Sequence, residues 1–575
     1  MRRKQVAMKK RIGYGIADFK AIQNENYYFT DKTMFLPEIE DAGRHLMFLR
    51  PRRFGKSLWC SILQCYYDVI YKAEFDKIFK GTWIHQHRTT EANSYYCLKF
   101  DFSRVQGRDI EQRFAFYVRE TILAFVHNHV LTISFATTDP IDMLNQLFTY
   151  MQGKKLKLYI IIDEYDNFAN NLFWTDKTSY RNIVSAENAF FKQFFAVIKG
   201  GTSETDAPVK RLFITGVTPM TMYDVTSGFN IGKNISLDST FNNMVGFTDS
   251  ELQEIFNYYE IELTTERQAL LSEWYNNYRF AKASELTVYN TDMILYFIDH
   301  FLSTGQPPDN LIDINVRSDY RKLQYLVYTN HKLNGNFELL KDLIGGHTVS
   351  IDNIVQDFSA FDLSKRDNFK SLLFYQGLVT IKDAQLKISM QIPNETIKRI
   401  DIDYLRGALE MENIFVLSTD ALAQKLKKFA LDGNIEVFKF LAAEINRNTG
   451  IRDSIYGEQN IKSMLIAYLS LTSYMVAKSE YELNKGFADI YLKPLNPYVK
   501  YVGLVEVKYF PRTKHGNSYK PSKSEIEAKI DEATQQLEKY ANDAEISWWT
   551  TDKGKKLQQV ILIFHGWELL KCVVV

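Results

Sequence analysis

Short apolar runs alternate with longer amphipathic stretches along the first 240 residues of the chain. The amphipathic stretches repeat their apolar positions with the period of a helix, most clearly at 57–79, 108–130 and 187–199. Between them lie four runs rich in β-branched and aromatic residues, at 45–50, 95–102, 157–163 and 210–217. Buried strands that alternate with helices are typical of a parallel sheet covered on both faces. We therefore predict an α/β fold for this part of the chain.

The pattern changes twice beyond residue 240. Helix-period segments dominate from 241 to 435, which predicts a helical lid and connector. After that, signals follow in the order αβββαβ: a helix at 458–472, strands at 474–480, 487–493 and 501–508, a helix at 525–541 and a strand at 558–564. We expect domains at 1–240, 241–435 and 436–575, which suits a chain of 575 residues at about 150 residues per domain.

Composition and charge exclude several classes of protein. The 70 Lys and Arg residues balance 69 Asp and Glu, and this net charge of +1 argues against a uniformly basic coat for nucleic acid or membrane binding. The 46% hydrophobic content excludes disorder as the main state. Four scattered cysteines form no disulfide framework or zinc motif, and no apolar run is long enough to span a membrane. We expect an intracellular, cytoplasmic protein that does not enter a membrane.

The segment LRPRRFGKSL, 49–58, joins a predicted strand to a predicted helix. In this context a GxxxxGK[ST] loop surrounds phosphates with its N–H groups, the lysine reaches the β- and γ-phosphates, and the hydroxyl ligates Mg²⁺. Gly55, Lys56 and Ser57 fill those places and predict an ATP·Mg²⁺ site, with Arg53 as a further anion-binding residue. Arg50 stands where the pattern has its first glycine, so a chance tripeptide in a basic turn stays an alternative.

The second half of a nucleotide signature ends the strand LYIIIDEYD, 158–166. Asp163 at the strand tip can hold Mg²⁺, and Glu164 can polarise the attacking water. Acidic residues at a strand end also serve as helix caps, and that alternative stays open. Thr215, near the end of a further strand, is a candidate γ-phosphate sensor or a capping threonine. Because the motifs fall in one alternating α/β run, we expect them to share one sheet.

A different chemistry is predicted for the segment 485–510. Glu506 and Lys508 stand two residues apart in a strand and therefore point to the same face. A turn at 493–497 folds this strand against the one that holds Asp489. Two carboxylates make a hard-oxygen site for Mg²⁺ or Mn²⁺, and an adjacent lysine can orient water and offset charge on a phosphate. These groups suit metal-dependent phosphodiester hydrolysis; an exposed ion pair on a hairpin is the alternative.

Several blocks of the sequence resemble one family, the AAA-ATPase-like proteins that carry a C-terminal PD-(D/E)XK nuclease-like domain. The blocks are YYFTDKTMFLPEIE (27–40), FLRPRRFGKSLWCSIL (48–63), LKFDFS (98–103), IIIDEYDN (160–167), FITGVTPM (213–220), GFTDSEL (246–252) and WYNNYRF (274–280). The family's loop also reads RPRRFGKS, so Arg50 follows the family pattern, whereas Asn277 departs from the usual WYNGYRF. The resemblance implies a P-loop NTPase sheet followed by a restriction-endonuclease-like domain.

The same resemblance implies roles for further residues. It places 28–32 near the nucleotide base and makes Arg279 a phosphate sensor on the lid. In the C-terminal domain it implies Glu458 as another metal ligand, with Glu480 as an alternative. Gln535 and Gln536 match the QL…Y pattern that the family shows on the following helix.

The predicted function is ATP binding and hydrolysis coupled to a metal-dependent nuclease that acts on nucleic acid, DNA in preference to RNA. The loop 511–524 is basic, and Tyr519 within it could stack on a base. One alternative is an ATP-dependent switch that binds nucleic acid without cleaving it. Another is a toxin or defence effector whose nuclease is gated by the ATPase. A homo-oligomer is compatible with each, because ring-forming ATPases complete their sites with an arginine from a neighbour.

Overall fold

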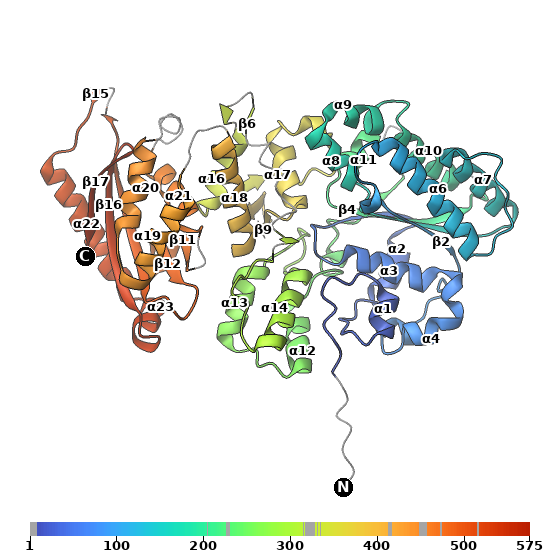
Figure 1. The fold of residues 1–575 in the computed structure, drawn as a ribbon, viewed down its shortest axis with the longest axis horizontal. Coiled ribbons are helices and arrows are strands. Elements are labelled where there is room, and N and C mark those ends of the chain that lie inside the picture. Colours follow the sequence, from blue (N-terminus) through green and yellow to red (C-terminus); the bar gives the residue numbers. More distant parts are fainter. Residues whose placement is uncertain are drawn as a thin grey trace, which may run out of the picture. The chain divides into compact units, whose positions relative to one another are not determined.

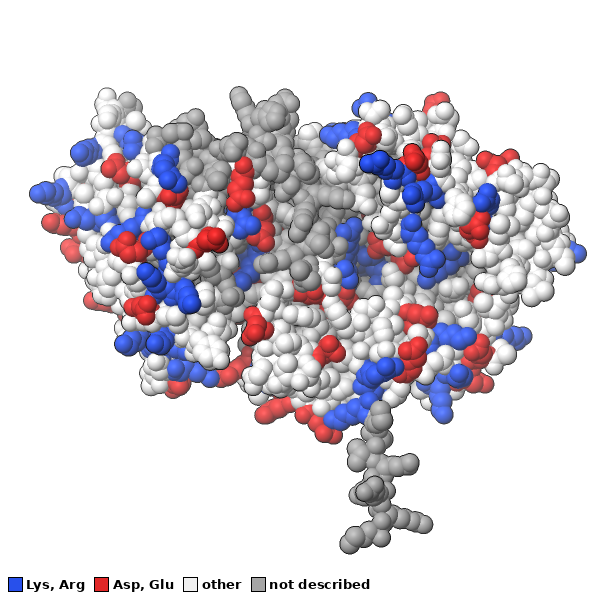
Figure 2. All heavy atoms as spheres, viewed as in Figure 1, with Lys and Arg blue, Asp and Glu red and all other residues white. Residues whose placement is uncertain are grey.

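The computed structural model describes residues 9–203, 205–225, 231–313, 315–316, 328–329, 332–333, 335–411, 417–447, 457–471, 474–514 and 517–575. The chain divides into two compact units (Figure 1). The first unit comprises Met1–Asp319 with Ser350–Glu395, and the second comprises Tyr320–Val349 with Thr396–Val575. The expected boundaries near residues 240 and 435 stay predictions. Basic and acidic side chains are interspersed over the face shown in Figure 2.

The first unit contains a parallel sheet with the strand order β2–β3–β4–β1–β5. Its strands are β1 (His45–Leu49), β2 (Tyr96–Asp101), β3 (Leu158–Asp163), β4 (Val209–Gly216) and β5 (Lys233–Asn234). Every residue of β3 is buried, as expected for a central strand covered on both faces. The predicted parallel sheet is confirmed, and the short strand β5 extends it beyond the four strands that the sequence pattern indicated.

Helices cover both faces of this sheet, with α3 on one face and α6, α7 and α10 on the other (Figure 1). Helix α7 begins after Asp139, whose side chain accepts the N–H groups of Ile141 and Asp142. The helices up to β5 are α1 (Phe19–Asn24), α2 (Phe35–Ala42), α3 (Lys56–Tyr67), α4 (Phe75–Ile78), α5 (Trp83–Gln86), α6 (Ile110–Asn128), α7 (Pro140–Gly153), α8 (Asn167–Thr175), α9 (Lys177–Tyr180), α10 (Phe190–Ser203) and α11 (Met220–Val225).

The remainder of the first unit is mainly helical, as predicted, with α12 (Asp249–Tyr259), α13 (Thr265–Tyr275), α14 (Thr291–Thr304) and α17 (Arg366–Tyr375). Thr248 and Glu251 form a reciprocal capping box at the start of α12. A three-stranded sheet was not predicted in this region: it has the order β8–β10–β9, with β8 (Val349–Ile351), β9 (Thr380–Asp383) and β10 (Ile388–Gln391). Strands of three or four residues are too short to show a clear alternating pattern.

The second unit is built on a mixed sheet with the order β11–β12–β13–β16–β17. Its strands are β11 (Met475–Leu483), β12 (Gly486–Pro494), β13 (Tyr501–Phe510), β16 (Lys556–His565) and β17 (Glu568–Val574). Only β13 and β16 pair in parallel, and helix α22 (Lys523–Ala541) lies between them in the chain. With α21 (Glu458–Leu469) before β11, the predicted order αβββαβ is confirmed, and β17 adds an antiparallel edge strand.

Helix α22 packs on this sheet through a buried apolar face. Ala533, Leu537 and Tyr540 join Leu504 and Ile561 in one hydrophobic cluster. The other elements of the unit are α16 (Gly335–Ile344), α18 (Glu395–Met411), α19 (Thr419–Asp432), α20 (Glu436–Arg447), α23 (Ala544–Ser547) and the two-stranded pairs β6 (Tyr328–Thr329) with β7 (Lys332–Leu333) and β14 (Thr513–Lys514) with β15 (Asn517–Ser518). Across the described parts of both units, helices lack the combined length and apolar character that a membrane span requires.

Candidate functional site

The loop between β1 and α3 has the backbone of an anion site. Arg53 and Gly55 adopt left-handed conformations, with φ of 69° and 96°. No side chain caps the N-terminus of α3, which begins at Lys56 directly after Gly55. Successive N–H groups at such a helix start are suited to phosphate oxygens. The left-handed turn at residue 55 explains why glycine stands there, because a side chain would be strained at that φ.

Charged side chains of this loop already lie in ion pairs and hydrogen bonds. The ammonium group of Lys56 donates to the main-chain oxygen of Pro51 at 3.0 Å and lies 3.7 Å from the Glu164 carboxylate. Arg53 pairs with Asp292 on α14 at 3.3 Å. These contacts hold the cationic ends of Lys56 and Arg53 beside the loop.

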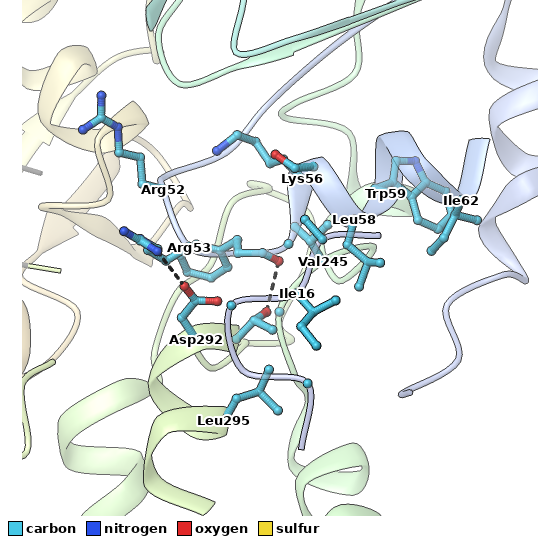
Figure 3. Close-up of a pocket in the computed structure, with 18 of the residues that line it drawn as sticks. Ile16, Arg52, Arg53, Lys56, Leu58, Trp59, Ile62, Val245, Asp292 and Leu295 are labelled. Carbon is cyan, nitrogen blue, oxygen red and sulfur yellow. Dashed lines mark hydrogen bonds and ion pairs between the residues drawn. The ribbon is translucent and has the colours of Figure 1, made fainter. Parts of the chain in front are cut away.

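A cavity of about 540 Å³ opens next to the loop between β1 and α3. Figure 3 shows the charged ends of Arg52, Arg53 and Lys56 on one side, with apolar side chains such as Ile16 and Leu295 on the other. The predicted residues Arg53, Gly55, Lys56, Ser57 and Glu164 line this cavity, as do Tyr28, Phe29, Thr30 and Lys32 from the segment that the resemblance places near the base. A cavity with one cationic and one apolar end matches the two ends of a nucleotide.

Asp163 lies at the end of β3, beneath the start of α3. It is buried near Ser57, the residue predicted to ligate Mg²⁺, and its Oδ1 atom has no hydrogen-bond partner among the described residues. Burial, with the neighbouring Glu164 carboxylate, raises the pKa of Asp163 to about 6. Glu164 itself adopts a left-handed backbone with φ of 52°, which turns its side chain toward Lys56. The predicted pair of motifs therefore meets at one edge of the sheet.

Thr215 and Thr218 have structural partners. The Thr215 hydroxyl is fully buried and donates to the main-chain oxygen of Phe48 at 2.7 Å, which ties β4 to β1. Asp166 accepts hydrogen bonds from the N–H groups of Val217 and Thr218 and from the Thr218 hydroxyl. Sequence reasoning did not single out Asp166, although it belongs to the quoted IIIDEYDN block; its buried bonds join the ends of β3 and β4 beside the site.

Arg50, the residue in place of the first glycine, is buried rather than presented to a ligand. Its guanidinium donates to the main-chain oxygens of Leu49, Ser236 and Phe241 at 2.6–2.9 Å. The rings of Phe48 and Phe280 each lie 4.3 Å from its central carbon. Burial lowers the pKa of Arg50 to about 9. These contacts fix the start of the loop to residues 236–241, which follow β5.

Arg279, the expected phosphate sensor, contacts main-chain oxygens. Its guanidinium donates to the carbonyl groups of Lys282 at 2.7 Å and of Ala281 and Lys382 at 3.4 Å. Asn277, the departure from the family motif, has a positive φ of 73° and donates to Pro393 at 3.0 Å. The turn therefore keeps the left-handed backbone that glycine favours.

In the second unit the structure brings Asp489, Glu506 and Lys508 together. Strands β12 and β13 are antiparallel, with Ile490 paired to Val505. The Asp489 main-chain N–H donates to Glu506 at 3.3 Å, and its carboxylate accepts the N–H of Val507 at 2.8 Å. Lys508 lies 3.3 Å from the Glu506 carboxylate. The predicted adjacency of the two carboxylates and the lysine is observed.

Helix α22 adds a partner for Lys508. The ammonium group donates to the side-chain oxygen of Gln536 at 2.6 Å and lies 3.6 Å from Glu532. Gln536 is one of the two glutamines that the resemblance pointed to on this helix. Burial, together with the Asp489 carboxylate, raises the pKa of Glu506 to about 8.

Lys462 on α21 was missed by sequence reasoning. Its ammonium lies 2.5 Å from Asp489, 2.9 Å from Glu458 and 3.2 Å from Glu480, so it contacts both candidates for an extra metal ligand. Burial lowers the pKa of Lys462, but the ion pairs with Asp489 and Glu458 outweigh it and raise the pKa overall. The spacing of Glu458 and Lys462, one helical turn apart, was the available signal.

The donor set suits a divalent cation. Asp489 and Glu506 are buried carboxylates on adjacent strands, and such hard oxygens are the preferred ligands of Mg²⁺ and Mn²⁺. Burial, and after it the Asp489 carboxylate, raise the pKa of Glu506, and a metal ion bound there would favour the ionised carboxylate. Within the described ranges, no group of three or more His, Cys, Asp or Glu side chains has metal-site geometry. The Lys462 ammonium lies among the carboxylates instead.

The basic loop after β13 is partly described, since residues 515–516 fall outside the described ranges. The guanidinium carbon of Arg512 lies 4.1 Å from the centre of the Trp567 ring, and Lys514 lies 5.1 Å from that of Tyr519. A ring nitrogen of His565 is 2.8 Å from the main-chain oxygen of Tyr519, so this histidine anchors the loop.

Two segments of the chain match known families. Residues 13–226 match the family model described as "Predicted AAA-ATPase", and residues 456–573 match that of the PD-(D/E)XK nuclease superfamily. These matches confirm the family resemblance and the order of its two segments along the chain.

Individual proteins are similar at greater distance. An uncharacterized protein in the vnfD 5′ region of Azotobacter chroococcum mcd 1 is 25% identical over 311 residues, which cover 52% of this chain and 55% of that protein. The ORC2 protein of Aeropyrum pernix, solved as ADPNP-ADP complexes, is 10% identical with a TM-score of 0.32 over 68% of this chain and 98% of its own. The CDC6P structure from Pyrobaculum aerophilum is 9% identical with a TM-score of 0.25 over 66% and 92%.

Proposed function

We propose that this chain, with its AAA-ATPase-like and PD-(D/E)XK nuclease superfamily segments, binds and hydrolyses ATP and cleaves nucleic acid with a divalent metal ion. The observation that carries the nuclease proposal is the contact of Asp489, Glu506 and Lys508 on two adjacent strands. The observation that supports the ATPase proposal is the cavity lined by Lys56, Ser57 and Glu164.

In the nucleotide site, each residue has a distinct role. The N–H groups at the start of α3 and the Lys56 ammonium would bind the phosphates. Ser57 and the buried Asp163, which lie close together, would hold Mg²⁺. Glu164 would orient the attacking water, and phosphate binding would compete with its ion pair to Lys56.

In the nuclease site, Asp489 and Glu506 would hold Mg²⁺ or Mn²⁺. A divalent ion there supplies Lewis-acid polarisation of a phosphate oxygen and lowers the pKa of a bound water. The Lys508 ammonium would donate to a phosphate oxygen as negative charge builds there. Gln536 would hold that ammonium in position through its 2.6 Å hydrogen bond.

The nuclease proposal is tested with the purified full chain, Mg²⁺ or Mn²⁺, and DNA or RNA substrates. Asp489→Ala and Lys508→Ala are each expected to lower the cleavage rate at least about 100-fold. Asp531→Ala, on the exposed side of α22, is the control and should cleave like the wild type. Equal cleavage by all variants contradicts the assignment. Metal-dependent binding of nucleic acid without cleavage would favour the switch function instead.

ATP binding is tested separately with a fluorescent ATP analogue. Lys56→Ala should weaken binding at least about tenfold, because a buried cation that contacts the phosphates is lost. Lys72→Ala removes an exposed lysine of the same unit and should bind normally. Undiminished binding by the Lys56 variant would exclude this cavity as the ATP site.

A further inference from the structure

A lysine stands at the centre of the acidic cluster in the second unit. The Lys462 ammonium contacts three carboxylates, those of Glu458, Glu480 and Asp489, within 3.2 Å. Its side chain is only 7% exposed. A buried ammonium in contact with several carboxylates occupies the kind of position that a metal cation takes in a hard-oxygen site.

The geometry of Asp489 shows which oxygen the lysine takes. One oxygen, Oδ2, accepts the main-chain N–H of Val507 at 2.8 Å, which is a fixed feature of the paired strands. The other, Oδ1, lies 2.5 Å from the Lys462 ammonium. The oxygen that the sheet leaves for a ligand is therefore the one in contact with Lys462.

The carboxylates of this region outnumber its ammonium groups, which favours the binding of a divalent cation. The side chains of Glu458, Glu480, Asp489 and Glu506 are accompanied by two ammonium groups, Lys462 and Lys508. With every carboxyl group ionised, two negative charges stay unbalanced, and Mg²⁺ or Mn²⁺ would neutralise them.

The two lysines differ in their surroundings. Lys508 is held by Gln536 on α22 as well as by Glu506, so it has a partner that does not bind metal. The contacts of the Lys462 side chain described above are all with carboxylates. Glu458 and Glu480 are 40% and 36% exposed, so they can retain the ammonium near solvent when it leaves Asp489.

We propose that the Lys462 ammonium occupies the cation position at Asp489, so that divalent metal binding displaces it and Lys462 sets the metal affinity of the site. This inference rests on the proposed metal-binding role of Asp489. Lys462 acts here as a positioning residue: it keeps the carboxylates together without metal and shifts to Glu458 and Glu480 when metal enters.

The test is calorimetric titration of the full-length protein with Mn²⁺ alone. Lys462→Met should bind Mn²⁺ at least about tenfold more tightly than the wild type, because a competing cation is removed from a buried carboxylate. Lys462→Arg keeps the charge and should stay near wild-type affinity. Lys500→Met, an exposed lysine of the same unit, should leave Mn²⁺ binding unchanged.

Further variants separate the outcomes. The gain in Mn²⁺ affinity of Lys462→Met should disappear in the Lys462→Met/Asp489→Asn double variant. Lys508→Met should gain less Mn²⁺ affinity than Lys462→Met. If Lys462→Met fails to fold without metal, Lys462→Gln replaces it in the test, because the glutamine amide can still donate to Asp489 and support the fold. Lys462→Gln should likewise bind Mn²⁺ more tightly than the wild type.

Equal Mn²⁺ affinity in wild type and Lys462→Met, with weaker binding in Asp489→Asn, overturns the inference and leaves the proposed nuclease metal site intact. Equal gains in Lys462→Met and Lys508→Met also overturn it, because they indicate a general charge effect. If Mn²⁺ binding does not depend on Asp489 in any variant, the proposed metal site and this inference both fail.

Discussion

The guanidinium carbon of Arg50 lies 4.3 Å from the centre of the Phe280 ring, so the loop after β1 is packed against a segment 230 residues further along the chain. Arg50, which departs from the GxxxxGK[ST] pattern, is therefore a buried residue that holds the loop in place. Its guanidinium donates three hydrogen bonds to buried main-chain oxygens, and a glycine at this position would remove all three donors.

Restoring the pattern with Arg50→Gly should therefore harm the protein. We expect the free energy of unfolding of the first unit to fall by about 2–4 kcal/mol, because buried charged hydrogen bonds and ring contacts are lost. Thermal unfolding followed by circular dichroism measures the change. Arg52→Gly, in the same loop, should cost less, since Arg52 is only partly buried. A variant with glycine at 50 that is as stable as the wild type would contradict the bracing role.

Asp166 should contribute more to stability than an exposed aspartate with a similar set of bonds. It is fully buried and accepts from Val217 and Thr218, so Asp166→Ala is expected to lower the free energy of unfolding by about 2–4 kcal/mol. Asp176 also accepts two N–H groups and a hydroxyl, but in an exposed turn. Urea unfolding of Asp166→Ala and Asp176→Ala should show a clearly smaller loss for the second; equal losses would refute the importance of burial.

Because of Asp401 on α18, we expect the free energy of unfolding to depend on pH. Burial raises the pKa of its carboxyl group well above the ordinary value, and neither oxygen has a hydrogen-bond partner among the described residues. The folded state therefore holds a proton that the unfolded state releases above pH ~4, so the stability contributed by the protonated group declines as pH rises toward the folded pKa.

Asp401→Leu should remove this decline of stability with rising pH. The variant is expected to be more stable than the wild type by about 1–3 kcal/mol at pH 8, since an unpaired buried polar group is replaced by an apolar one of similar size. The gain should be smaller at pH 5, where less free energy is needed to keep the carboxyl group protonated. Denaturant unfolding at the two pH values measures it, and a gain that does not grow with pH would count against the buried carboxyl group as its source.

Gln536 should position Lys508 for the proposed cleavage. Gln536→Ala removes the 2.6 Å hydrogen bond to the ammonium and should lower the cleavage rate about tenfold or more while the protein keeps its stability. Gln535→Ala, one position away and exposed on the same helix, is the matched control and should cleave normally. Equal rates for the two variants would mean that Gln536 does not act through Lys508.

Much of the fold followed from the periodicity of apolar residues. The strands predicted at 45–50 and 157–163 lie within one residue of β1 and β3, because a fully buried strand must be apolar throughout. The edge strands β5 and β17 and the short sheet β8–β10–β9 were missed. Such elements are brief or half exposed, so tertiary pairing rather than local pattern determines them.

The sequence by itself determined which groups carry chemistry, together with their local spacing. Lys56 next to Ser57 and Glu506 two residues before Lys508 are fixed by the covalent chain and by strand geometry. Only the tertiary structure decided the partners across elements: Lys462 against Asp489, Gln536 against Lys508, and Arg50 between two rings. Those contacts join residues from separate elements, and burial makes them strong, whereas local periodicity carries no information on which elements will meet. The near-neutral composition likewise did not reveal that the Lys462 ammonium on α21 would contact the buried carboxylate of Asp489 on β12.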